Sequence, residues 1–143
     1  MRASFSRSSN SNQFSSRIDG MNRRKHSWAC VNCRARVHVK IKSCDLCGCK
    51  DFHYFGSAIE FKRYAELCLL MDHGQLRDLE LQKPYPCIVK DQLVTTYKAD
   101  FVYNNKTGEQ VIEDVKPAFY RDELYKLKKK LVEAIYSIKI TEV

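Results

Sequence analysis

The segment 98–116 constrains this chain most, because it reads as two strands joined by an Asn-Asn-Lys-Thr-Gly turn. Side chains alternate between the two faces of a strand. Asp114 and Lys116 are therefore predicted to share one face, and Glu113 is predicted to point to the other. Across the hairpin, Asp100 is expected to lie close to the Asp114–Lys116 pair.

Two carboxylates beside an ammonium group predict a site for a hard divalent cation. Mg²⁺ prefers oxygen ligands and is usually held by one or two carboxylates together with substrate phosphate. We therefore predict Asp100 and Asp114 as ligands, with Lys116 over the reacting group. An ordinary explanation stays open, because a hairpin with one solvent-exposed face carries Asp, Glu and Lys, and such pairs contribute only a few tenths of a kcal/mol.

Residues 28–53 contain two Cys-x-x-Cys pairs separated by ten residues. Four thiolates at this spacing can close a tetrahedron around Zn²⁺, and the predicted ligands are Cys30, Cys33, Cys44 and Cys47. Cys49 is an alternative to Cys47, although Cys-x-x-Cys-Gly is the usual form. The segment resembles a zinc ribbon, a module often used to hold nucleic acid or another protein. It has almost no apolar core, so the metal is expected to be required for folding.

The net charge of +8 is concentrated in the first 53 residues, because residues 54–143 hold 14 basic and 14 acidic side chains. A basic arm on a neutral body favours a polyanion as partner, nucleic acid before membrane. Residues 1–27 read as a disordered basic tail, for which a merely solubilising role is the alternative. No apolar run reaches the roughly 18 residues of a membrane span, and no secretory signal is visible. We expect no membrane partner and a cytoplasmic location.

Between the two cysteine pairs, residues 34–42 alternate basic and apolar side chains. Period-2 alternation predicts a strand with one basic face. That face is either an ordinary solvated surface or a track for a DNA backbone, formed in the second case by Arg34, Arg36, Lys40 and Lys42.

The remaining chain predicts an α/β core with a mixed sheet, in the order helix, three or four antiparallel strands, helix, strand. The first helix is expected to run from Ser57 to about His73, with Ile59 and Tyr64 on its apolar stripe. Pro84 is expected to end a strand that begins at Leu76. The second helix is expected over 122–137, with an apolar face made by Leu124, Leu127, Leu131 and Ile135, and a final edge strand over 138–143.

Glu60 has two explanations. It stands three residues after Ser57, which is the spacing of a capping box and a sufficient structural reason for an acid at the start of a helix. Alternatively, the helix delivers Glu60 to the predicted metal site as a third carboxylate.

From about Phe55 to the C-terminus the sequence resembles the PD-(D/E)XK nuclease superfamily. More closely, it resembles a family of small phage-encoded endonucleases, some regarded as Holliday-junction resolvases. The matching segments are Ser-Ala-Ile-Glu-Phe-Lys-Arg-Tyr-Ala-Glu-Leu, Asp-Leu-Glu-Leu-Gln, Ala-Asp-Phe-Val-Tyr, Val-Ile-Glu-Asp-Val-Lys and Lys-Leu-Lys-Lys-Lys-Leu. The resemblance implies a restriction-endonuclease-like core over 54–143, preceded by the zinc ribbon over 28–53.

The resemblance also assigns roles. Glu60 would be the helix acid, Asp100 the main Mg²⁺ ligand, and Asp114 with Lys116 the (D/E)-x-K pair. Glu113 is a second candidate ligand. The sequence departs from the superfamily pattern in two places, since an alanine precedes Asp100 where Pro is expected and Pro117 follows Lys116 where Gly is expected.

The implied activity is Mg²⁺-dependent hydrolysis of phosphodiester bonds in branched or junction DNA. Lysines of the second helix would hold the DNA backbone together with the ribbon, and these are Lys126, Lys129 and Lys130. Paired cuts at a junction would need a homodimer. A different class of function stays open, in which the chain is a non-catalytic zinc-ribbon adaptor built on a decayed nuclease fold.

Overall fold

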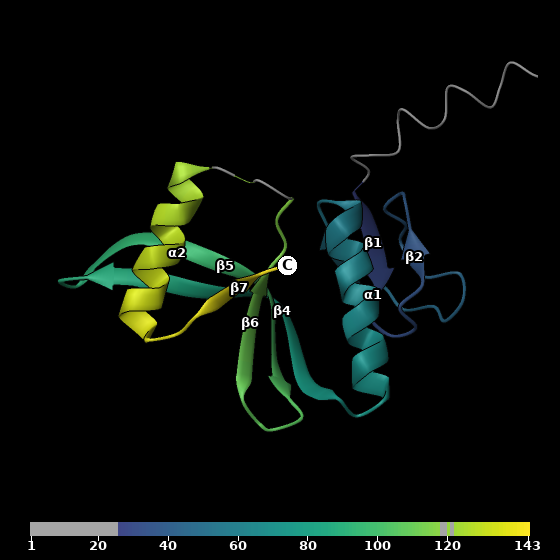
Figure 1. Cartoon of the computed structure of the whole chain (residues 1–143). Helices are drawn as coiled ribbons and strands as arrows, with labels where there is room; N and C mark the ends of the chain where they lie inside the picture. The colour runs from purple at the N-terminus through teal and green to yellow at the C-terminus, as the bar shows by residue number, and fades with distance from the viewer. Residues whose placement is uncertain (1–25, 118–119, 121) are drawn as a thin grey trace, which may run out of the picture. The chain divides into compact units, whose positions relative to one another are not determined.

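A computed structural model describes residues 26–117, 120 and 122–143 (Figure 1). Most of the predicted basic tail therefore lies outside the described residues. The chain divides into two compact units, of which the first ends at Ala58 and the second runs from Ile59 to Val143. Within the described residues, no helix combines the length and apolar character needed to cross a membrane.

The first unit contains a three-stranded antiparallel sheet. Its order is β2-β1-β3, with β1 at Ser27–Cys30, β2 at Arg36–Val37 and β3 at Phe52–Phe55. The strand predicted over 34–42 is wrong beyond β2, and Arg34 has a left-handed φ of 62°. The buried residues of this unit include two of the clustered thiols, Cys30 and Cys44, so the alternating apolar side chains find little apolar surface to cover, and Val39 is exposed.

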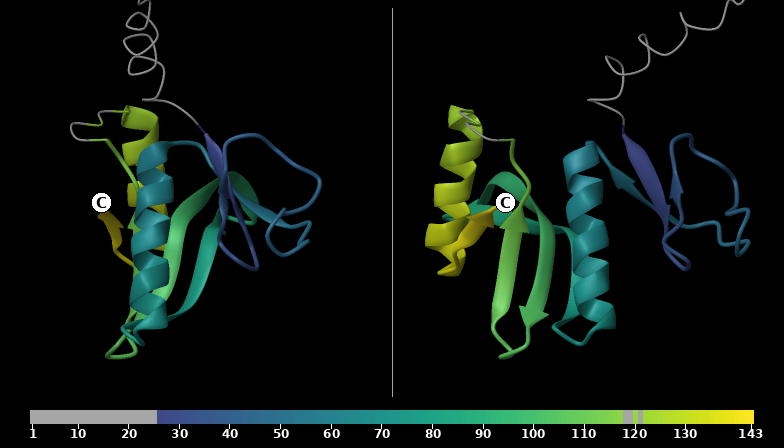
Figure 2. Two further views of the ribbon diagram at one scale, coloured as in Figure 1. Left: turned by 90° about the vertical axis from the view of Figure 1, so that its right-hand side faces the viewer. Right: turned by 45° about the vertical axis from the view of Figure 1, so that its right-hand side comes forward.

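The second unit confirms the predicted order of helix, three antiparallel strands, helix and strand. Its elements are α1 (Ala58–Asp72), β4 (Leu76–Val89), β5 (Gln92–Asn105), β6 (Gln110–Asp114), α2 (Glu123–Tyr136) and β7 (Ile140–Glu142). The sheet order is β4-β5-β6-β7, antiparallel except for the parallel β6–β7 pair. Helices α1 and α2 lie on opposite sides of the sheet (Figure 2). The fold class is therefore mixed α/β.

Strand β4 continues through both of its prolines to Val89, so the predicted end at Pro84 is wrong. The reason is topological: β4 is an edge strand, and a proline there can lack its N–H on the unpaired side. Lys90 and Asp91 then both adopt positive φ, as a two-residue hairpin turn requires. The result is a long β4–β5 hairpin.

Helix α1 ends where the sequence predicts, at a glycine. Gly74 has a φ of 66°, and the amide of Gln75 donates to the carbonyl of Leu70 at 2.8 Å, which is the Schellman arrangement. Tyr64 is buried as predicted, together with Leu67 and Cys68. Ile59 is exposed, so the predicted apolar stripe is wrong at that position.

Helix α2 has the predicted length but a different buried face. Asp122 caps it by accepting hydrogen bonds from the amides of Leu124 and Tyr125. Val132 is fully buried, and Leu131 packs against the core as predicted. Leu124, Leu127 and Ile135 are exposed, so the predicted apolar face is wrong at these three positions. The helix carries two apolar stripes, and the sheet takes the one containing Tyr125 and Val132. The buried core there consists of Tyr85, Cys87, Tyr97, Ala99, Val102, Ile112, Val132 and Ile140.

Candidate functional site

The four predicted zinc ligands come together in the first unit. The Sγ atoms of Cys30 and Cys47 are 3.4 Å apart, as are those of Cys33 and Cys44. All four sulfurs lie within 4.8 Å of one another. A ZnS₄ tetrahedron with bonds of about 2.3 Å needs sulfur–sulfur distances of about 3.8 Å. The four cysteines can therefore hold a metal ion such as zinc.

The chemistry of the thiols also fits a metal. The backbone amide of Cys33 is the main cause that lowers the pKa of Cys30 to about 6. For Cys33 the amide of Ala35 lowers the pKa, but the thiol of Cys44, burial and the other thiols together raise it to about 12. A cation that binds the thiolates would remove the unfavourable interactions among these crowded groups. Cys49 instead contacts its own loop, where its Sγ accepts from the amide of Asp51 at 3.4 Å.

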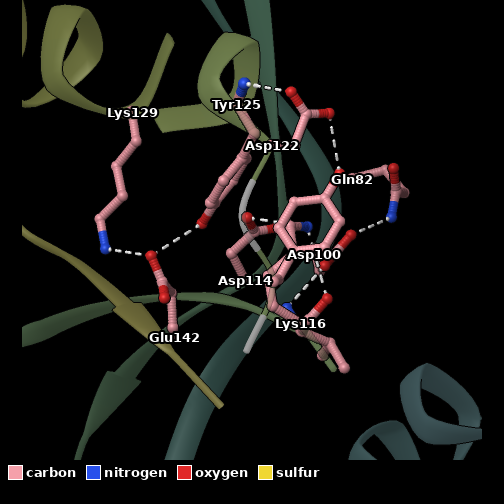
Figure 3. Close-up of polar contacts among 10 residues, drawn as sticks. Gln82, Asp100, Asp114, Lys116, Asp122, Tyr125, Lys129 and Glu142 are labelled. Carbon is pink, nitrogen blue, oxygen red and sulfur yellow. Dashed lines mark hydrogen bonds and ion pairs between the residues drawn. The ribbon is translucent and has the colours of Figure 1, made fainter. Parts of the chain in front are cut away.

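In the second unit, Asp100 and Asp114 lie side by side in a cleft of about 350 Å³. Lys116 joins them, with its Nζ 2.9 Å from Oδ2 of Asp114. Figure 3 shows the three side chains gathered beside Tyr125 of α2. The predicted shared face of Asp114 and Lys116 is confirmed. The cleft is lined by Thr96, Tyr97, Lys98, Asp100, Asp114, Lys116, Asp122, Leu124, Tyr125 and Lys128.

Asp100 is fixed by two hydrogen bonds, one from the residue that follows β6 and one from β4. Its Oδ2 accepts from the amide of Val115 at 2.8 Å, and its Oδ1 accepts from Nε2 of Gln82 at 2.9 Å. Gln82 has a φ of 52°, an uncommon backbone for a side chain of this kind. Burial, followed by the neighbouring Asp114 carboxylate, raises the pKa of Asp100 to about 7. The two carboxylates therefore lie close enough for the charge of one to disfavour ionisation of the other.

Lys116 is enclosed by aromatic rings. Its Nζ lies 4.6 Å from the ring centre of Tyr125 and 5.6 Å from that of Tyr120. Cation–π attraction and the ion pair to Asp114 both hold the ammonium over the carboxylates. Tyr125 is itself anchored, because its hydroxyl donates to Oε1 of Glu142 at 3.3 Å. Through Tyr125, helix α2 therefore helps to set where the ammonium group of Lys116 lies.

The carboxylate pair has the properties of a divalent-cation site. Oδ2 of Asp114 is buried and makes an ion pair with Lys116 but no hydrogen bond. Burial of this oxygen has a cost that the ion pair only partly offsets, and the second carboxylate beside it adds another. A cation held between Asp100 and Asp114 would relieve both costs, and oxygen ligands are those that Mg²⁺ prefers. The residues present therefore fit Mg²⁺.

Glu60 and Glu113 have different surroundings from this pair. Glu60 lies in the first turn of α1 and does not line the cleft. Among the described residues, the four cysteines are the group of three or more Cys, His, Asp or Glu side chains close enough to share one ion. Glu60 is therefore not gathered with Asp100 and Asp114. Glu113 faces α1, as strand alternation predicts, and accepts from Arg63 Nε at 2.8 Å and from the Tyr103 hydroxyl at 2.7 Å.

The predicted DNA-contacting lysines are placed unequally. Lys129 pairs with Glu142 and Lys126 pairs with Glu123, both at 2.7 Å, and Lys130 is exposed. The cleft instead receives Lys128, which the prediction of contacts omitted, and Lys98. In the first unit Arg36, Lys40 and Lys42 are exposed, whereas Arg34 is partly buried.

Of the residues that sequence reasoning missed, Lys98 left a signal, because it stands two positions before Asp100 on one strand. Gln82 left none, since its approach to Asp100 depends on how β4 pairs with β5. Tyr125 also left none, because its role depends on which stripe of α2 faces the sheet.

Comparison with known proteins places the second unit in a family. No curated protein and no solved structure matches this chain. One family model does match, over residues 49–142, and its description is "Protein of unknown function (DUF1064)". The match contains Asp100, Asp114 and Lys116 and excludes the four clustered cysteines. Because the match covers well over half of the sequence, the chain belongs to the DUF1064 family.

Proposed function

We propose that this protein is a Mg²⁺-dependent endonuclease that hydrolyses phosphodiester bonds in DNA, with a preference for branched or junction DNA. The observation that carries the proposal is the pair of adjacent carboxylates, Asp100 and Asp114, with Lys116 2.9 Å from Asp114 in an open cleft. The succession of helix, three strands, helix and strand also supports it, because the resemblance to PD-(D/E)XK nucleases implies this core.

Three residues of the cleft have direct roles in the proposed reaction. Asp100 and Asp114 hold Mg²⁺, which when bound supplies polarisation of the scissile phosphate and activation of the attacking water. Lys116 is held by Asp114 and by the ring of Tyr125, so its ammonium is already in place to stabilise the charge that develops on the phosphate oxygens. Because little reorganisation is needed, this stabilisation is available when the reaction begins.

The lysines at the rim supply affinity for DNA. Lys98 and Lys128 line the cleft, and both carry positive charge that can neutralise the phosphates of a DNA backbone. Contacts to phosphate position a duplex but do not read its sequence. Recognition by DNA shape therefore suits this surface, and paired cuts at a junction would need two copies of the chain. The four cysteines hold Zn²⁺ in a separate, structural role.

The test is a cleavage assay with Mg²⁺ on a four-way junction, a flap, a nicked duplex and an intact duplex. Lys116→Ala should lower the cleavage rate at least about a hundredfold, as loss of one preorganised electrostatic group does. Its affinity for the same DNA should stay within about twofold, because one lysine among many contributes little. Lys106→Ala, in the exposed β5–β6 turn, is the matched control and should cut normally. Cleavage by Lys116→Ala and Asp100→Ala at the wild-type rate would refute the nuclease and leave a DNA-binding adaptor.

A further inference from the structure

Three aromatic rings lie together on one face of the sheet in the first unit. The ring centres of Trp28 and Tyr54 are 5.5 Å apart, and His26 lies 5.1 Å from Trp28 and 6.1 Å from Tyr54. Trp28 and Tyr54 are direct cross-strand partners on β1 and β3. Their planes are tilted by 58° rather than parallel, so the two rings are not stacked face to face on each other.

This aromatic face is open to solvent. Tyr54 is 55% exposed and His26 is exposed as well, whereas Trp28 between them is partly buried. The alternate residues of the same strands, Ser27, Ala29 and Phe55, are buried. The sheet therefore buries Ser27, Ala29 and Phe55 on one face and carries Trp28 and Tyr54 on the other. Exposed aromatic groups in a unit with so little core call for a functional explanation.

The segment that carries Trp28 and Tyr54 has a positive net charge once the residues just beside it are counted. Residues 28–53 contain five Lys or Arg and two Asp, and Lys40, Lys42 and Lys50 are exposed. A basic surface with exposed aromatic rings is the combination that binds single-stranded nucleic acid: the lysines follow the phosphates and the bases stack on the rings. An acidic protein would be attracted by the charge, but it would leave the faces of three rings without a matching flat partner.

We propose that His26, Trp28 and Tyr54 form a platform on which unpaired nucleobases stack. Bases inside a duplex are stacked on one another and cannot reach such a surface. The platform would therefore favour DNA with unpaired bases, such as a flap or an opened junction. Binding by the platform does not depend on the carboxylate cleft, so this proposal and the proposed cleavage can fail separately.

The test compares two oligomers of about 12 nucleotides that carry the same phosphates, oligothymidylate and a strand of abasic residues. Binding is measured with the full chain and no added Mg²⁺, so that no cleavage occurs. Trp28 is the one tryptophan of the sequence, so a change in intrinsic tryptophan emission reports on this ring. Oligothymidylate should change the emission and bind about tenfold more tightly than the abasic strand, which is the usual scale for stacking of a base on an aromatic ring.

Two substitutions at Tyr54 separate stacking from folding. Tyr54→Phe keeps the ring and should keep the tenfold preference. Tyr54→Leu keeps apolar bulk but removes the ring, and should reduce the preference to less than about threefold while binding of the abasic strand stays unchanged. Zinc content, measured on each variant, shows that the unit is folded.

Equal affinity of the wild-type protein for both strands, with no change in emission, would overturn the proposal even if Tyr54→Leu failed to fold. An emission change of the same size with both strands would also overturn it, because phosphate contact alone would explain the response.

Discussion

The carboxylate pair should cost stability when no metal is bound, and Asp100→Asn measures that cost. The pKa of Asp100 is raised from 3.8 to about 7 by burial and by Asp114. At about 1.36 kcal/mol per pKa unit, charging Asp100 in the folded protein costs up to about 4 kcal/mol. The pKa shift belongs to the pair of carboxylates rather than to Asp100 alone. We therefore expect neutralising Asp100 to recover about half of this free energy, roughly 2 kcal/mol.

The geometry allows asparagine to replace Asp100 with both hydrogen bonds kept. Its Oδ1 can accept from the amide of Val115, and its Nδ2 can face Gln82, whose amide can rotate to present its oxygen. Without Mg²⁺ at pH 8, Asp100→Asn should therefore raise the melting temperature by about 6 °C, at about 3 °C per kcal/mol for a chain of this size. Asp91→Asn, in the exposed hairpin turn where φ is 63°, is the control and should change nothing.

The pH dependence has a definite sign. The folded protein binds the Asp100 proton more tightly than the unfolded chain, so stability falls as pH rises between about 4 and about 7. The advantage of Asp100→Asn should thus be largest at pH 8 and should shrink to less than half by pH 5.

Mg²⁺ should raise the melting temperature of the wild-type protein and not that of the variant, since a ligand that binds the folded state stabilises it. A variant that is less stable than wild type by the same amount at pH 8 and pH 5 would show that Asp100 is a structural acceptor. The carboxylate-pair reasoning would then be wrong.

Two further predictions concern the fold. Freshly purified protein should contain about one Zn²⁺ per chain. Cys33→Ser should lose the zinc and also the protease resistance of residues 26–58, because thiolates replace an apolar core there. Zinc retained by this variant at full stoichiometry would contradict the assignment. Glu113→Gln should destabilise the protein by about 2 to 4 kcal/mol in thermal or urea unfolding, because it leaves the buried side of Arg63 without its charged partner; a loss below about 0.5 kcal/mol would show that this pair contributes little.

The hairpin at 98–116 could be predicted from the sequence because its determinants are local. Alternation sets the faces of Asp114 and Lys116, and a polar Gly-containing turn joins β5 to β6. The course of β4 could not be predicted in the same way. Whether a strand tolerates Pro84 depends on whether it lies at an edge, and that is decided by the order of the whole sheet.

The orientation of α2 shows a second limit. Leu124 and Leu127 are more hydrophobic than Tyr125, so composition favours the leucine stripe as the buried one. The sheet beneath presents Tyr97 and two carboxylates, however, and a tyrosine can cover such a surface with its ring while its hydroxyl bonds to Glu142. Polar groups on the sheet therefore decide which stripe is buried, and those groups come together only in the folded chain.

Two consecutive residues of β6, Glu113 and Asp114, have different roles. Glu113 points toward α1, where Arg63 and Tyr103 bind both of its oxygens, so its charge fastens the helix to the sheet. Asp114 points toward α2, where one oxygen lacks a hydrogen bond and a second carboxylate lies alongside. The charge of Asp114 is paired with Lys116 and opposed by the second carboxylate, and a bound cation would remove that opposition. The alternation of a strand thus separates, within two residues, the carboxylate that holds the structure together from the one available for chemistry.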